Sequence, residues 1–158
     1  MTQRRDKTLI IGVGNPGRGD DAAGRIAAKR LRARAPAGLR IAECEGEATA
    51  LIALMQEAEE IVLIDALVSG AEPGTIARID LATSPPPKGR FGLSSHGFGL
   101  AEAIELARAL GQLPARCVIY GVEGRSFDHG ARLSPAVDAA VDEVVERILD
   151  SIAAEARG

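Results

Sequence analysis

Aromatic side chains are nearly absent from this chain of 158 residues, which has three Phe, one Tyr and no Trp. The core is therefore expected to be aliphatic, and no set of rings is available on which nucleic-acid bases could stack. Positive charge is not in excess either, because the formal net charge is -3 and the sequence pI is about 5.5. The one basic cluster, Arg25 to Arg34, has helical spacing and is interpreted as a solvated helix face. We expect no nucleic-acid partner.

Long apolar runs and cysteine motifs are also lacking. No apolar run approaches the roughly 20 residues that span a bilayer, and the charged segment 1–7 leads into a short apolar stretch without a cleavage site. Cys44 and Cys117 show neither a CxxC motif nor a metal-ligand spacing, so we predict two buried thiols rather than a disulfide. These features predict a cytoplasmic protein with no membrane partner.

The length and the periodicity of the chain predict a single domain over residues 1–158. Such a length suffices for one core that buries about 70% of the unfolded surface, and is too short for two ordinary domains. Apolar runs predict four buried strands, and an alternating pattern predicts an edge strand. These segments are 8–14, 39–44, 60–66 and 117–123, with the edge strand at 74–81. Helical segments between them indicate an α/β protein, a three-layer α/β/α sandwich whose mostly parallel (mixed) sheet has about five strands.

Four apolar stripes at helical spacing predict the helices. The stripes are Ala23, Ile26, Ala27 and Leu31; Ala48, Leu51, Met55 and Ala58; Leu100, Ala103, Ile104, Ala107 and Leu110; and Val137, Val141, Val144, Ile148 and Ile152. Pro36 and Gly38 end the first helix, Gly111 ends the third, and Ser134 with Pro135 begins the last. The three prolines of segment 83–95 exclude regular structure there and predict an exposed loop, of a length that is often functional.

Three side chains at the ends of predicted elements could form a metal site. Asp21 follows the first strand, Asp65 closes the third, and His96 precedes the third helix. Ligands of open α/β sheets bind beyond the carboxyl ends of the strands. Two carboxylates and one imidazole are suitable ligands for Ni²⁺ or Zn²⁺, and they leave coordination positions open.

Each of these residues also has a structural interpretation. Asp20 and Asp21 could cap the first helix, and both roles could hold at once, with Asp20 as the cap and Asp21 as the ligand. A buried Asp65 requires a partner, which could be a backbone donor, a cation or a metal. His96 could cap the helix that follows it. His129 could compete for the ligand role, but it lies in a glycine-flanked turn that is expected to be exposed.

Other chemistries have less support. The loop GVGNPG lacks the third glycine of a dinucleotide-binding motif, and Pro16 removes one N–H donor, so nucleotide binding is disfavoured. Ser94 and Ser95 have no recognisable triad order and no GxSxG motif, and HExxH is absent. Serine hydrolase and zincin mechanisms are therefore not indicated.

From about Leu9 to Ile152 the chain resembles the [NiFe]-hydrogenase maturation endopeptidases. The resemblance rests, in this order, on GVGNPGRGDDAAG, LIDALVSGAEPGTI, SSHGFGLAEAIELARALG, YGVEG and LSP. In that family the second acid of the DD or DE pair, the aspartate after the third strand and the histidine before the next helix form the metal site. They correspond to Asp21, Asp65 and His96, which the resemblance implies to be both metal-site and catalytic residues.

The resemblance also implies a substrate, a partner and a metal. The family removes the C-terminal extension of a hydrogenase large subunit after nickel insertion, so the implied partner is that precursor. The nickel would be contributed by the substrate, and Zn²⁺ or Cd²⁺ would substitute in vitro. A metal could polarise the scissile carbonyl or activate a bound water, or a free carboxylate could act as general base; the sequence leaves these routes open. We expect a monomer.

Two alternative functions remain open. GVGNPG also resembles the opening of the bacterial peptidyl-tRNA hydrolases, esterases of related fold, but the similarity ends after six residues. A non-catalytic nickel-binding assembly factor could use the same three ligands. One position departs from the endopeptidase pattern, because Gly124 stands where that family commonly has a proline.

Overall fold

The structure, a computed structural model, describes residues 7–84, 90–91 and 99–157. The strands are β1 (Thr8–Val13), β2 (Arg40–Cys44), β3 (Glu60–Val68), β4 (Ile76–Asp80), β5 (Arg90–Phe91) and β6 (Arg116–Glu123). The helices are the 3₁₀ helix η1 (Gly19–Ala22) and the α-helices α2 (Ala23–Arg34), α3 (Ala48–Met55), α4 (Leu100–Ala109) and α5 (Pro135–Arg157). The four predicted α-helices and the five predicted strands are thus confirmed.

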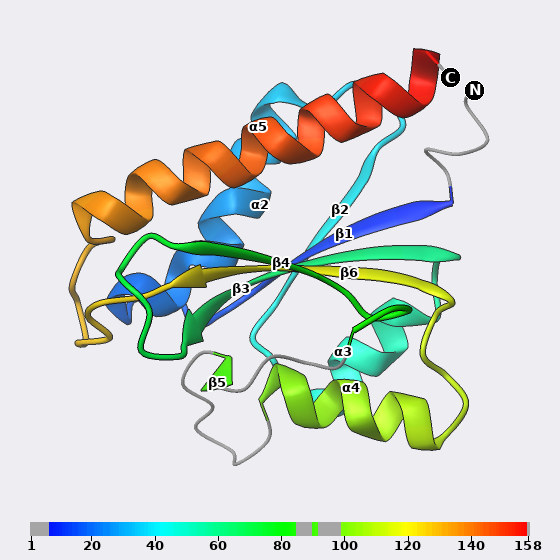
Figure 1. Ribbon diagram of the computed structural model, residues 1–158, viewed down its shortest axis with the longest axis horizontal. Coiled ribbons are helices and arrows are strands. Elements are labelled where there is room, and N and C mark those ends of the chain that lie inside the picture. The colour runs from blue at the N-terminus through cyan, green and yellow to red at the C-terminus, as the bar shows by residue number, and fades with distance from the viewer. Residues whose placement is uncertain (1–6, 85–89, 92–98, 158) are drawn as a thin grey trace.

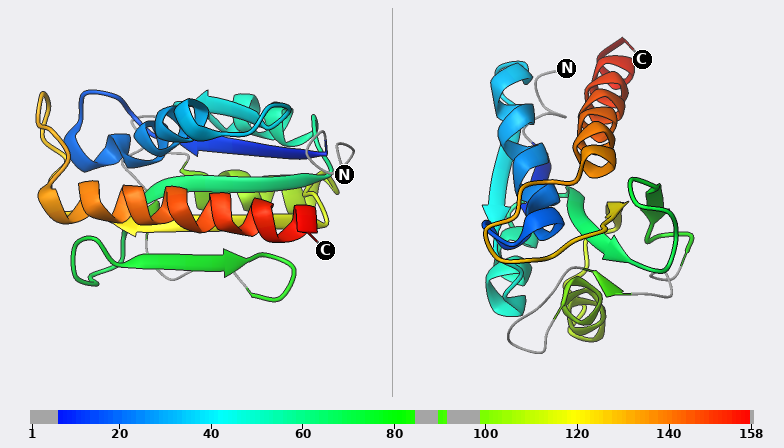
Figure 2. Two further views of the ribbon diagram at one scale, coloured as in Figure 1. Left: turned by 90° about the horizontal axis from the view of Figure 1, so that it is seen from above. Right: turned by 90° about the vertical axis from the view of Figure 1, so that its left-hand side faces the viewer.

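The strands form one mixed sheet in the order β2-β1-β3-β6-β4, and β5 pairs with β3. β2, β1, β3 and β6 are parallel, whereas β4 runs antiparallel at the edge next to β6. Helices α2 and α5 cover one face of the sheet, and α3 and α4 cover the other (Figure 1). The right-hand view of Figure 2 shows the same layers along the sheet. The predicted three-layer α/β/α sandwich is confirmed, and the carboxyl ends of the four parallel strands meet at one end of the sheet.

The core is aliphatic, as its composition predicts, and lies in two layers. Along β3, Ile61 and Leu63 face the layer under α3 and α4, while Val62 and Ile64 face the layer under α2 and α5. This alternation follows from the two-residue period of a strand, and it explains why residues 61–64, which are covered on both faces, are all apolar.

The two cysteines are buried thiols, as predicted from their isolated positions in the sequence. Cys44 and Cys117 are free and buried, and burial raises the pKa of the Cys117 thiol to about 12. Among the helices of the described segments, none is both long and apolar enough to cross a bilayer.

Two details of the sequence interpretation are wrong. Leu110 was assigned to the buried face of its helix, but it is 58% exposed because α4 ends at Ala109 and Leu110 already belongs to the turn. The segment 83–95 was expected to lack regular structure. Its residues Arg90 and Phe91 instead pair antiparallel with Val68 and Leu67 of β3, which have free backbone groups beyond the end of β1.

Gly24 lets α2 start directly against the sheet. A Cβ added at Gly24 would lie 2.1 Å from the carbonyl oxygen of Ile64 and 2.3 Å from that of Val13. These distances are far below van der Waals contact, so no larger residue fits without moving the helix. The glycine therefore sets the close approach of the start of α2 to the ends of β1 and β3.

We predict that Gly24→Ala lowers the free energy of unfolding by about 3 kcal/mol or more, because overpacking against backbone cannot be relieved by a rotamer change. Gly38→Ala is the matched control, since Gly38 has a φ of +91° but no atom within 4 Å of an added Cβ. It should cost only about 1 kcal/mol, the strain of a left-handed alanine. Urea unfolding measures both, and equal losses would contradict the close-approach argument.

Candidate functional site

Asp21 is held at the end of β1 by a turn that folds back on itself. It lies in η1 and is only 2% exposed. Its carbonyl oxygen accepts a hydrogen bond from the N–H of Asn15 at 3.2 Å. A Cβ on Gly14 would lie 2.1 Å from the same oxygen, so a glycine is required where the turn meets the strand. The motif GVGNPGRGDD thus places Asp21 against the carboxyl end of the sheet.

Asp65 lies on the neighbouring strand, and its position differs from the prediction. The sequence interpretation put Asp65 at the end of its strand, but β3 continues to Val68. The strand extends because β6 stays paired with it as far as Leu67, while β1 has already stopped beside Ile64. Asp65 is therefore the first residue of β3 beyond the last one paired with β1, and it is buried at 3% exposure.

The two carboxylates are close enough for their charges to interact. Burial raises the pKa of Asp65 well above its ordinary value, the negative charge of Asp21 raises it further, and the N–H of Ala66, 2.8 Å from Oδ1, opposes the shift. A carboxyl group in this environment retains its proton to unusually high pH. A cation placed between the two groups would reverse this, because it favours both charged forms.

His96 lies outside the described residues, so the structure does not place it relative to the two aspartates. The N-cap position of α4 is Gly99, whose N–H donates to Glu102 Oε2 at 2.9 Å. Within the segments that the structure describes, no group of three His, Cys, Asp or Glu side chains is arranged to hold a metal ion. His129 is exposed in a turn, as expected from its sequence context.

Asp20 does not have the role that the sequence suggested. It was interpreted as the cap of the first helix, but the N-cap of α2 is Ala22, without a side-chain cap hydrogen bond. The fully buried carboxylate of Asp20 instead accepts hydrogen bonds from the N–H groups of Arg125, Ser126 and Ser134 and from the Ser134 hydroxyl. Burial raises the pKa of Asp20, but these hydrogen bonds outweigh it and lower the pKa below its ordinary value. The carboxylate is held ionised.

Glu123 is a buried acid to which the sequence interpretation gave no role. It ends β6 and is 2% exposed. Its Oε1 accepts hydrogen bonds from the N–H of Ser69 at 2.8 Å, the Ser69 hydroxyl at 2.9 Å and the N–H of Ala71 at 2.9 Å. Glu123 therefore fixes the loop that follows β3. An acid that closes an apolar run was the available signal, the same one that singled out Asp65.

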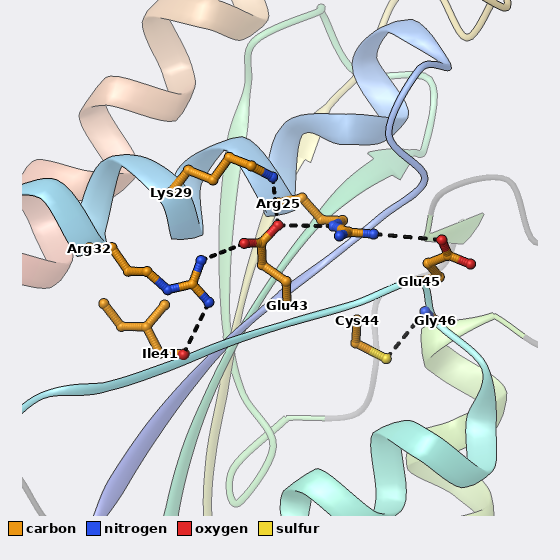
Figure 3. Close-up of polar contacts among 8 residues, drawn as sticks. All are labelled: Arg25, Lys29, Arg32, Ile41, Glu43, Cys44, Glu45 and Gly46. Carbon is orange, nitrogen blue, oxygen red and sulfur yellow. Dashed lines mark hydrogen bonds and ion pairs between the residues drawn. The ribbon is translucent and has the colours of Figure 1, made fainter.

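The basic cluster of α2 is paired rather than merely solvated. Figure 3 shows Glu43 of β2 accepting hydrogen bonds from Arg25, Lys29 and Arg32. Burial raises the pKa of Glu43, but these three partners outweigh it and lower the pKa to about 2. The other side of α2 pairs with α5, where Arg30 contacts Asp138 at 2.6 Å and Asp142 at 2.9 Å. The interpretation as a solvated face thus missed that these charges join α2 to its neighbours.

We predict that Glu43→Gln lowers the free energy of unfolding by about 1–2 kcal/mol at pH 7, after allowance for solvent screening at exposed Lys29 and Arg32. Because the folded pKa is depressed, the stabilisation is present above the ordinary glutamate pKa of 4.5 and is lost as the pH falls toward about 2. The difference between the variant and the parent should therefore vanish near that pH in urea unfolding curves.

Glu146→Gln is the control, because Glu146 pairs with Arg34 at side-chain exposures of 48% and 51%. The Glu146→Gln substitution should lower the free energy of unfolding by at most about 0.5 kcal/mol. A Glu43→Gln effect that persists unchanged at low pH would show that packing rather than charge carries it.

The sequence and the fold of this chain are matched among known proteins. The family model described as hydrogenase maturation protease matches residues 32–151. The chain belongs to the hydrogenase maturation protease family, and the protein is accordingly a peptide hydrolase.

Individual relatives agree with this assignment. The chain is 28% identical over 155 residues to a putative hydrogenase maturation protease of Methanocaldococcus jannaschii, covering 94% of this chain and 98% of that one. It is 27% identical over 149 residues to the hydrogenase 2 maturation protease of Escherichia coli K12, covering 92% and 90%. Among solved structures, it is similar to the maturation protease HybD of Thermococcus kodakarensis, with a TM-score of 0.71, 27% identity and coverage of 90% and 96%. The E. coli maturating endopeptidase HybD, at 24% identity over 94% and 93% of the chains and a TM-score of 0.74, shows the same fold.

Proposed function

We propose that the protein removes the C-terminal extension of a [NiFe]-hydrogenase large subunit after nickel insertion, and that Asp21, Asp65 and His96 act at the nickel carried by the substrate. The observation that carries the proposal is a pair of buried carboxyl groups, Asp21 after β1 and Asp65 in the carboxyl-terminal half of β3, in which the charge of Asp21 adds to burial in raising the pKa of Asp65. Two like charges held this way are costly alone and favourable around a cation. The site is thus suited to a positive centre that arrives from outside.

The donor set fits that metal. Carboxylate oxygens with one imidazole bind borderline divalent ions such as Ni²⁺ and Zn²⁺, and Cd²⁺ is a reasonable in vitro substitute. Three protein ligands leave positions for the groups that already hold the nickel in the precursor. In this proposal the enzyme completes the coordination of the nickel from its own side, so that only a nickel-loaded precursor is a good substrate.

Two chemical routes to peptide cleavage remain compatible with this donor set. A metal beside the scissile bond polarises its carbonyl or activates a bound water, while a carboxylate acts as general base. The raised pKa of Asp65 beside a second carboxylate suits a pair in which one group carries the proton and the other accepts one. We assign the general-base role to this pair. The cleavage rates of variants at Asp21 and at Asp65 would show which of the two accepts the proton.

The proposal also covers the partner of the protein, its location in the cell and its oligomeric state. The partner is the large-subunit precursor, and we expect a cytoplasmic monomer without membrane or nucleic-acid partners. The relatives named as maturation proteases support hydrolysis over the alternative of a passive nickel-binding assembly factor. The peptidyl-tRNA hydrolase alternative requires a basic surface for the acceptor stem, to which the net charge of -3 is poorly suited.

The proposal is tested by intact mass after incubation with a large-subunit precursor from the same organism, nickel-loaded in one sample and nickel-free in the other. One C-terminal peptide should be released from the loaded precursor only, because the metal supplies part of the binding site. Asp65→Asn should remain folded and release none, since it removes a proposed ligand and base.

The other outcomes are informative. Equal cleavage of the nickel-free precursor would overturn nickel recognition while keeping the protease. Unchanged mass in both samples, with hydrogenase maturation in cells still dependent on the protein, would favour the assembly factor.

We further predict that the free protein binds Ni²⁺, Zn²⁺ or Cd²⁺ weakly, with an affinity that falls below about pH 6 as the imidazole ligand is protonated. Calorimetry of the parent, His96→Ala and His129→Ala measures this. His96→Ala should lose binding, whereas the exposed His129 is the matched histidine control. The reverse pattern would refute the ligand assignment.

A further inference from the structure

The pair Asp20–Asp21 divides its two carboxylates between different tasks. In a 3₁₀ helix successive side chains are about 120° apart, so adjacent residues of η1 point in different directions. The carboxylate of Asp20 lies against residues 125–134, whereas η1 itself, which carries Asp21, packs against β3, the strand of Asp65. Only one member of the pair thus belongs to the proposed site.

We infer that Asp20 is a positioning residue, which fastens the turn carrying Asp21 to the segment 124–134 and thereby fixes the Asp21 carboxylate against Asp65. This inference rests on the proposed function, in which Asp21 contacts the metal of the substrate. Asp20 itself contacts neither the metal nor the scissile peptide.

Asp20 is bound to that segment through both its side chain and its backbone. Its Oδ2 accepts from the N–H groups of Arg125 and Ser126 at 2.8 and 2.9 Å, and its Oδ1 accepts from the N–H of Ser134 at 2.7 Å. Its own N–H donates to the carbonyl oxygen of Ser126 at 2.8 Å. Rotation of η1 would therefore break several hydrogen bonds of a buried charged group together.

The two segments also pack closely on either side of Asp20. The N–H of Gly130 donates to the carbonyl oxygen of Gly17 at 2.7 Å. A Cβ on Gly19, whose φ is +58°, would lie 2.5 Å from the carbonyl oxygen of Ser126. A Cβ on Gly124 would lie 3.2 Å from the Cβ of Asp20 and 2.5 Å from Phe127 Cζ, so a small residue at 124 suits this packing.

The anchor is rigid because it leads directly into α5. The carbonyl oxygen of Ser134 accepts from the N–H of Asp138 in the first turn of that helix. Val137, Val141 and Val144 of α5 are fully buried against the sheet. Through Asp20, the turn that carries Asp21 is thus tied to a packed helix, which is how a reactive group is held within a fraction of an ångström.

Kinetics with the nickel-loaded precursor test the inference in the full chain. Asp20→Asn replaces an acceptor oxygen with an NH₂ group that faces N–H donors, so kcat should fall about 10- to 100-fold through misplacement of Asp21, with KM nearly unchanged. Ser134→Ala removes only the hydroxyl that donates to Asp20 and should give a smaller loss of kcat. Ser134→Thr should restore it, because it returns the hydroxyl at a partly exposed position.

A second readout separates positioning from general destabilisation. Zn²⁺ affinity, measured by calorimetry on folded protein, should fall in Asp20→Asn because one ligand is displaced. Ile148→Val, on the buried face of α5 and far along that helix from Ser134, is the stability control and should change Tm but neither kcat nor Zn²⁺ affinity.

Each outcome has one meaning. If the parent does not cleave the precursor, the proposed function fails. If the parent cleaves it and Asp20→Asn, at a temperature where it is folded, matches Ile148→Val in kcat and Zn²⁺ affinity, the positioning inference is overturned. If Asp20→Asn does not fold, the Ser134→Ala and Ser134→Thr pair decides, and equal kcat in both would overturn it.

Discussion

The burial of two carboxyl groups, near enough for the charge of one to act on the other, is the constraint on which the rest of the site depends. Asp21 and Asp65 are withdrawn from water, and burial together with the charge of Asp21 raises the pKa of Asp65. Such a pair relaxes by moving apart unless the backbone on each side is fixed. Asp65 is fixed because β3 stays paired with β6 at this position and is paired with β1 as far as Ile64, and Asp21 is held by the glycine turn, by the close approach of Gly24 and by Asp20.

The sheet topology explains why the loops converge on this pair. Four parallel strands end at the same side, and β1 stops beside Ile64, which leaves room above Asp65 for η1. Two further buried acids bind the surrounding loops. Glu123, at the end of β6, binds the loop that follows β3, and Asp20, in η1, binds the segment before α5. Backbone N–H groups of these loops are thus bound by carboxylates of Glu123 and Asp20, which lie outside the proposed ligand set.

Much of the fold follows from periodicity, because buried strands and amphipathic helices have strong local signals. The five main strands and four α-helices were predictable for that reason, whereas β5 was not, since a two-residue strand in a proline-rich segment is created by its partner. The exposure of Leu110 was not predictable either, because the apolar spacing does not show that α4 ends one residue earlier. For the site, the positions of Asp21 and Asp65 were predictable from strand ends, but the continuation of β3 past Asp65 depends on pairing with β6. The role of Asp20 depends on residues more than 100 positions away, which no local pattern can reveal.

Carboxylates of one chain take opposite electrostatic states according to what surrounds them. Asp20 and Asp65 are both buried, yet hydrogen bonds from N–H groups and a hydroxyl lower the pKa of Asp20, while a neighbouring negative charge adds to burial in raising that of Asp65. Glu43 is held ionised by three cations instead. A carboxylate whose charge is already compensated has little to gain from a metal ion, whereas one that repels its neighbour gains a great deal. Hydrogen bonds and ion pairs to the carboxylate, rather than burial or residue type, are therefore what separates Asp20 and Glu43 from Asp65.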